Sequence, residues 1–418
     1  MKNRIQFFLK NLKSLWGDDN FIKNAKATAT SFSRHRKMSL LECLIFLLTK
    51  EKTTIAFALH KFLPSLSHKT DRISSQAFSK ARKHIVPQFL LDTLHELGQK
   101  FYQQKKSIKT WQTFRVLAID GTSILLPNVR ELKDTFGTIG CTQVQFPSVA
   151  TQTSLMYDVL NHIPLDVVIG RAHENERRMA TEHIDWLINH PTSHQNLLLF
   201  DRGYPDKSLM MKLIDAQQQF VFRLGKAHYK KEVATVAVDG SVTLEWEEKD
   251  FQIRIIKFIR PDGVEVTFAT NIFSSTLLVE DFITLYALRW GIETNYNIMK
   301  NKLELINFSG RTKIAIEQEI YICCIQALLL HNLILDSDTK IQQNQKTKYT
   351  YKTNINHATG ILFEYFRQLI FAKNISKILK HMFSIILYEK IPIKPNRYAP
   401  RRHRSRKTRH HANRKSNI

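Results

Sequence analysis

The feature that most constrains the fold is a change of sequence pattern near residue 111. Before it, apolar residues recur every three or four positions, a spacing that predicts helices. After it come alternating, β-branched runs such as RVLAIDGTSILLP, followed by segments in which helical and strand patterns take turns. This order predicts an α/β domain over residues 111–225.

Residues 226–275 interrupt that pattern. Helical periodicity disappears there, and alternating segments are broken by Asp-Gly pairs at 239 and 262, which are strong hairpin signals. We therefore expect a β-rich insertion, after which helical spacing returns. The predicted organisation is a helical domain at 1–108, a central domain at 109–335, a helical region at 336–392 and a disordered basic tail at 393–418.

Positive charge is concentrated at the two ends of the chain. The formal net charge is +25, with 21 Lys and Arg against 7 Asp and Glu in residues 1–110, and 19 against 4 in residues 336–418. The middle is slightly acidic, with 22 against 26. A solubilising surface is the simpler explanation of a basic excess, but basic arms around an acidic centre favour nucleic acid as the partner.

Neither a membrane nor a disulfide framework is indicated. The N-terminus lacks the apolar core of a signal peptide, and Gln326 and His331 interrupt the most apolar run, so we expect a soluble, cytoplasmic protein. The four cysteines show no C-x-x-C spacing, which predicts buried thiols rather than a zinc site.

Two short helical segments, TTIAFALHKFL and SSQAFSKARKHI, are joined by a polar, turn-prone stretch. Ser74 or Ser75 is placed to cap the second segment, whose exposed side would show Lys80, Arg82 and Lys83. This arrangement is compatible with a helix-turn-helix that binds DNA. A pair of helices with a basic, solvated face explains the same pattern.

Two aspartates follow apolar strands. Asp120 closes VLAID and precedes Gly121, and Asp201 follows NLLLF. Open α/β sheets place their sites beyond strand ends, where two neighbouring carboxylates repel one another unless a cation joins them. Oxygen ligands favour Mg²⁺ or Mn²⁺. One such Asp is more often a turn or a cap, but two in the same role predict a metal site.

A third acid lies in the helical segment YALRWGIETNYNIMK. At about 100° per residue, Tyr286, Arg289, Glu293 and Lys300 fall on one stripe of an ideal helix. A third carboxylate could thus join the metal while the tyrosine and the two bases follow a phosphate backbone. If this stripe is simply exposed to solvent, an i,i+4 ion pair explains why Arg289 and Glu293 share it. It does not explain why Tyr286 and Lys300 are aligned with them.

These residues resemble the signature of a known family. The spacing Tyr286-x2-Arg289-x3-Glu293-x6-Lys300 is similar to the Y-R-E-K signature of DDE transposases of bacterial insertion sequences, the "IS four" family. DGT at Asp120 and DRGY at Asp201 resemble the contexts of that family's two aspartates. The resemblance implies an α/β ribonuclease-H-like catalytic core with a β-rich insertion between Asp201 and Glu293.

The resemblance also implies a chemistry. Asp120, Asp201 and Glu293 would be the catalytic residues and would hold two divalent ions, Mg²⁺ or Mn²⁺, for in-line attack on a DNA phosphodiester. The implied phosphate contacts are Tyr286, Arg289, Lys300 and Arg202. The partners would be double-stranded DNA, at the transposon ends and the target, and a second copy of the chain in a homodimer.

Two other functions fit the same residues. One is a catalytically inactive or recruited DNA-binding protein, against which the presence of all three acids argues. The other is a nonspecific nuclease of the same fold, which would cut DNA without joining ends. A transposase remains the leading hypothesis.

Overall fold

The computed structural model describes residues 3–34, 37–51, 53–65, 72–104, 108–140, 147–343 and 349–393. The chain forms two compact units. Residues 1–97, 125–149 and 297–418 make up the helical unit, and residues 98–124 and 150–296 make up the sheet unit. Both units are discontinuous in sequence. The chain passes from one to the other after residues 97, 124, 149 and 296, and not at the predicted boundaries of 108 and 335. Nearly all of the predicted basic tail lies outside the described residues.

The helical pattern predicted for residues 1–108 is confirmed in the described part of that region. Its helices are α1 (Arg4–Trp16), α2 (Asp19–Lys23), α3 (Leu40–Thr49), α4 (Ile55–Phe62), α5 (Ser75–Arg82) and α6 (Pro87–Tyr102). The later helices of the helical unit are α7 (Arg130–Phe136), α13 (Lys313–Gln343), α14 (Ile355–Phe371) and α15 (Ser376–Tyr388). Two short strands, β10 (Tyr351–Lys352) and β11 (Ile391–Pro392), pair with each other.

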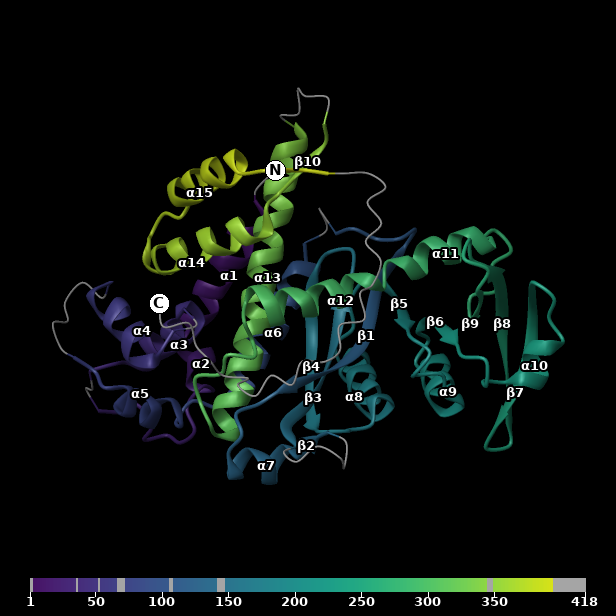
Figure 1. The fold of residues 1–418 in the computed structure, drawn as a ribbon, viewed down its shortest axis with the longest axis horizontal. Helices are drawn as coiled ribbons and strands as arrows, with labels where there is room; N and C mark the ends of the chain where they lie inside the picture. Colours follow the sequence, from purple (N-terminus) through teal and green to yellow (C-terminus); the bar gives the residue numbers. More distant parts are fainter. Residues whose placement is uncertain are drawn as a thin grey trace. The chain divides into compact units, whose positions relative to one another are not determined.

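α13 is the central helix of the helical unit. Helices α1, α3, α14 and α15 pack against it (Figure 1). By length and composition alone α13 could cross a membrane, contrary to the expectation from sequence, but 89% of its apolar window is buried within the protein. Gln326 does not break the run, because its Nε2 donates to the Leu48 carbonyl at 2.7 Å inside the core. A helix that is apolar all round belongs in such a core.

The predicted helix pair is present as α4 and α5, but its basic face is different from the prediction. Ser74 caps α5 by accepting a hydrogen bond from the Ala77 N–H at 3.1 Å, as expected. Lys80 and Lys83 are exposed. Arg82 is not, since only 3% of its surface reaches solvent.

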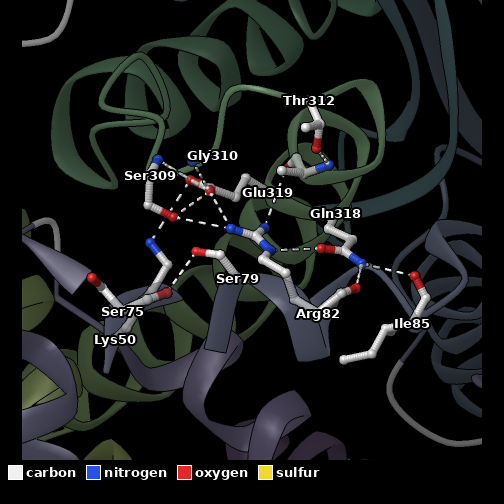
Figure 2. A network of polar contacts seen from close by, with 11 residues as sticks. Lys50, Ser75, Ser79, Arg82, Ile85, Ser309, Gly310, Thr312, Gln318 and Glu319 are labelled. Carbon is white, nitrogen blue, oxygen red and sulfur yellow. Dashed lines mark hydrogen bonds and ion pairs between the residues drawn. The ribbon is translucent and has the colours of Figure 1, made fainter. Parts of the chain in front are cut away.

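Arg82 instead joins α5 to α13 through a buried polar network (Figure 2). Its Nε donates to Gln318 Oε1 at 2.9 Å, and its Nη1 lies 3.2 Å from Glu319 Oε1. Glu319 also forms an ion pair with Lys50 of the α3 C-terminal end, at 3.7 Å. A residue predicted to contact DNA therefore holds two helices together. The sequence could not show this because its partners lie more than 200 positions away.

The sheet unit contains a mixed sheet with helices, which confirms the α/β expectation. Its strands are β1 (Phe114–Leu125), β3 (Ser148–Asp158), β4 (Ile163–Arg171), β5 (Gln195–Phe200), β6 (Gln219–Leu224), β7 (Asp239–Trp246), β8 (Lys249–Ile259) and β9 (Glu265–Thr270). The spatial order is β4-β3-β1-β5-β6-β9-β8-β7, and the short β2 (Thr138–Ile139) pairs with the start of β3. The helices are α8 (Glu176–Asn189), α9 (Lys207–Asp215), α10 (Lys230–Ala234), α11 (Val279–Ala287) and α12 (Trp290–Asn297).

The region predicted to be rich in strands, residues 226–275, holds β7, β8 and β9, which extend the sheet. β9 pairs with β6, and β8 and β7 follow in antiparallel order. The hairpin signal at Asp262-Gly263 is correct, since Gly263 turns with φ 78° between β8 and β9. The signal at Asp239-Gly240 is wrong, because both residues lie in β7. The turn falls at Glu247 and Glu248, which take φ 49° and 63° without the usual Asn or Gly.

Removing the Arg82 side chain should destabilise the helical unit. Arg82→Ala leaves the Glu319 carboxylate and the Gln318 amide buried with fewer partners, so the free energy of unfolding should fall by about 3 to 5 kcal/mol. Denaturant unfolding measures this change. Lys80→Ala, an exposed change on the same helix, is the control and should stay within about 0.5 kcal/mol of the wild type. Equal stabilities for the two variants would contradict the assigned role of Arg82.

Candidate active site

Parallel pairing of β1 and β5 brings two aspartates together. The register aligns Ala118 with Leu199, so continuing it by two residues sets Asp120 opposite Asp201. Neighbouring strands lie about 4.8 Å apart, which places the two carboxyl groups at one edge of the sheet. Asp201 directly follows β5, as predicted. Asp120 does not end its strand, because β1 continues beyond the paired region to Leu125.

The segment that supplies the third acid is not one continuous helix. α11 ends at Ala287 and α12 begins at Trp290. Between them the backbone tightens: the Arg289 N–H donates to the Tyr286 carbonyl and the Ile292 N–H to the Arg289 carbonyl, each three residues back at 3.1 Å. Such turns advance by about 120° per residue rather than 100°. The even stripe predicted from Tyr286 onward is therefore wrong in its geometry.

A second irregularity follows α12. Residues Ile298–Lys302 form a π-helical turn, in which the Leu303 N–H donates to the Ile298 carbonyl at 2.9 Å. Lys300 lies in this wider turn and belongs to the helical unit, whereas Glu293 belongs to the sheet unit. The ideal wheel that aligned Lys300 with Glu293 does not apply here.

Arg289 nevertheless brings the three predicted acids to one point. Its Nη2 lies 2.7 Å from Glu293 Oε1 and 3.8 Å from Asp201 Oδ2, and its Nη1 lies 3.7 Å from Asp120 Oδ2. The side chain is buried, with 4% of its surface exposed. One guanidinium thus serves as the shared counter-ion of three carboxylates that come from two strands and a helix. This placement makes Arg289 an internal residue of the acid cluster.

Tyr286 also points to the cluster. Its hydroxyl donates to Asp201 Oδ1 at 3.2 Å and approaches the Phe200 carbonyl at 3.4 Å. The ring packs on the buried Phe268, with 4.7 Å between ring centroids. Burial raises the pKa of the Tyr286 phenol, so it stays a hydrogen-bond donor at neutral pH. Tyr286 therefore orients Asp201.

α12 is held on the sheet beside Asp120. The Tyr296 hydroxyl donates to the Asp120 carbonyl at 2.7 Å, three residues along the helix from Glu293. A Cβ on Gly291 would lie 3.3 Å from Val159 Cβ, tighter than most such contacts. The glycine therefore allows the close approach that lets Glu293 reach the aspartates.

Glu176, at the start of α8, is a fourth acid in the cluster. Its Oε1 accepts a hydrogen bond from Gln152 Nε2 at 2.8 Å. Its carboxylate lies against the glycines that follow the two aspartates: a Cβ on Gly121 would be 2.6 Å from Oε1, and one on Gly203 would be 3.8 Å from Oε2. Glu176 is not among the site residues predicted from the sequence. The sequence signal for Glu176 is the glycine after Asp120, because the missing side chain of Gly121 leaves the space that the Glu176 carboxylate occupies.

Tyr204 contributes a hydroxyl with nothing to bind in the described structure. The side chain is 1% exposed, and its oxygen has no hydrogen-bond partner among the described residues. Burial raises the pKa of this phenol, and the nearby charges of Glu176 and Asp120 raise it further. A buried hydroxyl near carboxylates can donate a hydrogen bond to a water molecule or to another oxygen atom bound in the cluster.

Crowding of negative charge alters the titration of the site. Burial, with smaller contributions from the charges of Glu176 and Asp201, raises the pKa of Asp120 to about 7 although Arg289 opposes the rise. Burial also raises the pKa of Glu176. Arg289 therefore only partly offsets the burial and mutual repulsion of these carboxylates.

The donor set suits a divalent cation, although the side chains are not arranged around one. Across the described ranges no three Asp, Glu, His or Cys groups are spaced to hold a metal ion as they stand. The oxygens of Asp120, Asp201 and Glu293 surround the guanidinium of Arg289 instead. Carboxylate oxygens are the ligands that Mg²⁺ and Mn²⁺ prefer. The Tyr204 hydroxyl, which has no partner among the described residues, is available to donate a hydrogen bond to a further oxygen ligand of the ion, such as water.

The remaining predicted contacts to DNA are spread over the chain. Arg202 is exposed next to Asp201, and its N–H donates to Asp201 Oδ1 at 2.8 Å. Lys80 and Lys83 are exposed in the helical unit, where Lys300 is half-buried. All five predicted contacts other than Arg82 and Arg289 thus have part of their side chains open to solvent: Lys80, Lys83, Arg202, Tyr286 and Lys300.

Comparison with known proteins shows that the part of the chain holding this site matches a protein family. The family model described as "Transposase DDE domain" matches residues 111–329, which is just over half of the chain. A probable transposase for insertion sequence element IS5377 from Geobacillus stearothermophilus is 24% identical over 165 residues. That alignment spans 37% of this chain and 43% of the relative, so less than half of the relative's length is matched.

A solved structure is also similar over most of the chain. It is the cryo-EM structure of the piggyBac transposase synaptic complex with hairpin DNA. The match covers 93% of this chain and 87% of that one, at 11% sequence identity and a TM-score of 0.45.

The raised pKa of Asp120 predicts a pH dependence of stability. The carboxyl ordinarily titrates at 3.8 and in the fold at about 7, so folding favours its protonated form. The stabilisation is complete below the lower value and is lost as pH rises through the higher one. In metal-free buffer, Asp120→Asn should therefore gain free energy of unfolding relative to the wild type as pH rises across that window. Denaturant titrations at several pH values measure it, and a difference that does not change with pH would contradict the assignment.

Proposed function

The chain belongs to the transposase DDE-domain family, and we propose that it is a transposase that cuts and joins DNA at the ends of its own insertion sequence. The observation that carries this proposal is the convergence of Asp120, Asp201 and Glu293 on one guanidinium. Carboxylates gathered from separate elements cost free energy, and a protein keeps them together when they bind a cation that does chemistry.

We also propose that the catalytic core is ribonuclease-H-like. Support comes from the strand order β4-β3-β1-β5-β6, in which β3 and β4 are antiparallel and β1, β5 and β6 are parallel. Asp120 lies on β1, and Asp201 directly follows the neighbouring β5, at the centre of this order. The insertion β7–β9 falls between Asp201 and Glu293, where the family resemblance predicts it.

Asp120, Asp201 and Glu293 would hold the divalent ions, Mg²⁺ or Mn²⁺. When bound, two such ions activate the attacking hydroxyl and stabilise the leaving oxygen of a phosphodiester. The protein's part is to supply ligands already in place. Tyr286 orients Asp201, and Tyr296 fixes the backbone of Asp120.

Glu176 would act beside these ligands. Its carboxylate lies between the glycines after the two aspartates, and Gln152 holds it there. From that position it adds negative charge to the site and accepts a proton from a water molecule or positions one. The Tyr204 hydroxyl would donate to the same water or to a phosphate oxygen.

DNA would be held by residues around this site. Arg202, exposed beside Asp201, is the proposed phosphate contact nearest the acids. Arg289 has its charge turned towards the carboxylates, so its proposed contribution to DNA binding is through the reacting phosphate alone. Lys80, Lys83 and Lys300 would bind phosphates further along the duplex.

The basic ends of the chain and the family support a cytoplasmic protein that works on double-stranded DNA. Joining the two ends of one element to a target requires both ends to be held at once. A homodimer on DNA, with one active site for each end, is the proposed assembly. Binding by a chain with a net charge of +25 should weaken steeply with salt.

The central test is cleavage and joining of DNA that carries the terminal repeats flanking the reading frame. Wild-type protein with Mg²⁺ or Mn²⁺ should yield cut ends and joined products, and chelation of the metal should abolish both. Glu293→Gln keeps the shape of the side chain but loses its charge, so activity should fall to background. Gel analysis of labelled DNA measures both products.

The products separate the alternatives. Cuts without joined ends would identify a nuclease of the same fold. Tight DNA binding without any metal-dependent product would identify a non-catalytic DNA-binding protein. Glu293→Gln as active as the wild type would contradict the site itself.

Glu176→Gln tests the fourth acid. If the Glu176 carboxylate supports the metal site, Mn²⁺ affinity should fall about 10- to 100-fold, as is typical when the supporting groups of a metal site are changed. Calorimetry with Mn²⁺ and no DNA measures this without any catalytic step. Glu182→Gln, an exposed change on the same helix, is the matched control and should bind Mn²⁺ like the wild type. Unchanged affinity in both variants would remove Glu176 from the site.

A further inference from the structure

A cavity of about 250 Å³ lies in the helical unit between α5 and the start of α13. Its lining includes Ser79, Arg82 and Lys83 on one side and Ser309, Arg311 and Thr312 on the other. Three of the described lining residues are basic and none is acidic. The volume is below the roughly 300 to 1,000 Å³ of sites for small organic ligands, and six of the nine lining residues are polar or charged. This cavity suits a small anionic group.

The wall of the cavity is rigid and positively charged. Arg82 is fixed by Gln318 and Glu319, and its Nη1 also donates to Ser309 Oγ at 3.2 Å (Figure 2). Glu319 pairs with two buried cations, Arg82 and Lys50. These three side chains together leave one positive charge behind the cavity.

The cations that are available to a ligand are Lys83 and Arg311. Both are exposed, and neither forms an ion pair or hydrogen bond through its side chain within the described part of the chain. They line the cavity together with Arg82, whose own charge is already matched by Glu319. Two charges beside one polar cavity attract an anion more strongly than two separate surface residues would.

Backbone donors add to these side chains. The N–H groups of Arg311 and Ile314 form no hydrogen bond within the described chain. Thr312 Oγ1 accepts from the Ala315 N–H at 3.3 Å, which leaves its hydroxyl proton free to donate. A Cβ on Gly310 would lie 2.2 Å from that of Ala315, so only glycine lets this loop pass so close to α13. The loop thus presents donors, and no carboxylate, to the cavity.

We propose that this cavity binds a phosphate group of the DNA backbone through Lys83, Arg311 and Thr312. The assignment of the phosphate to DNA rests on the proposed function, and it adds a contact that is distinct from the acid cluster of the sheet unit. The cavity adjoins α5, the second helix of the pair that carries the exposed Lys80. A phosphate held here would set the position of that helix pair on the duplex without reading its sequence.

The salt dependence of DNA binding tests this proposal. Each phosphate contact contributes about 0.9 to the slope of log affinity against log salt concentration. The double variant Lys83→Ala/Arg311→Ala should lower the slope by about 0.9 and weaken binding equally for different duplex sequences. Lys377→Ala/Lys380→Ala removes two exposed lysines of α15 in the same unit and is the matched control, which should keep the slope of the wild type. Fluorescence anisotropy with a labelled duplex measures both.

A second variant separates a loss of DNA binding from a loss of folding. Ser79→Asp brings a carboxylate into the cavity while both cations remain, so DNA affinity should fall although the thermal unfolding midpoint stays near that of the wild type. Inorganic phosphate provides another arm. It should raise the unfolding midpoint of the wild type and not that of Lys83→Ala/Arg311→Ala.

The outcomes are distinct. If the wild type binds DNA and both cavity variants keep its slope and affinity, the cavity proposal is wrong and the proposed function stands. If inorganic phosphate binds through Lys83 and Arg311 while DNA binding is unchanged, the cavity holds free phosphate and the assignment to DNA is overturned. If the wild type does not bind DNA at all, both this inference and the proposed function fail.

Discussion

Carboxylates gathered at one edge of a sheet repel one another unless a cation lies between them. In the sheet unit that cation is Arg289, and the arrangement of the site depends on its contacts. Its guanidinium lies within 3.8 Å of oxygens from Asp120, Asp201 and Glu293. Burial and the neighbouring carboxylates raise the pKa of Asp120 to about 7 although Arg289 opposes the rise. The proposed metal chemistry rests on this gathering of carboxylates, because divalent cations are the usual partners of such groups.

Several local features of the backbone serve that one contact. The parallel register of β1 and β5 sets the two aspartates side by side. The tight turn at Arg289 separates α11 from α12, so that Arg289 and Glu293 both reach the acids although the helical stripe is broken. Gly121 leaves the space that the Glu176 carboxylate occupies. In the helical unit, by contrast, buried charge has a structural use, since Arg82 joins α5 to α13.

Local patterns were enough to predict most elements, because strand alternation and helical spacing depend on near neighbours. They also singled out Asp120, Asp201 and Glu293, from two strand patterns and a family spacing, and the fold brings these three acids together. They failed where distant residues decide: the burial of Arg82 depends on Gln318 and Glu319, and the discontinuous units depend on packing across the chain. The break at Arg289 was missed because an ideal helix was assumed, and Glu176 because its place depends on a turn after β4.

The most direct measurement of the central claim is a crystal structure of the protein grown with Mn²⁺, with the metal located by its anomalous scattering. We expect manganese to be bound by oxygens of Asp120, Asp201 and Glu293, with the guanidinium of Arg289 moved away from the two aspartates. Manganese bound elsewhere, with the three contacts of Arg289 unchanged, would contradict the claim that these acids form a metal site.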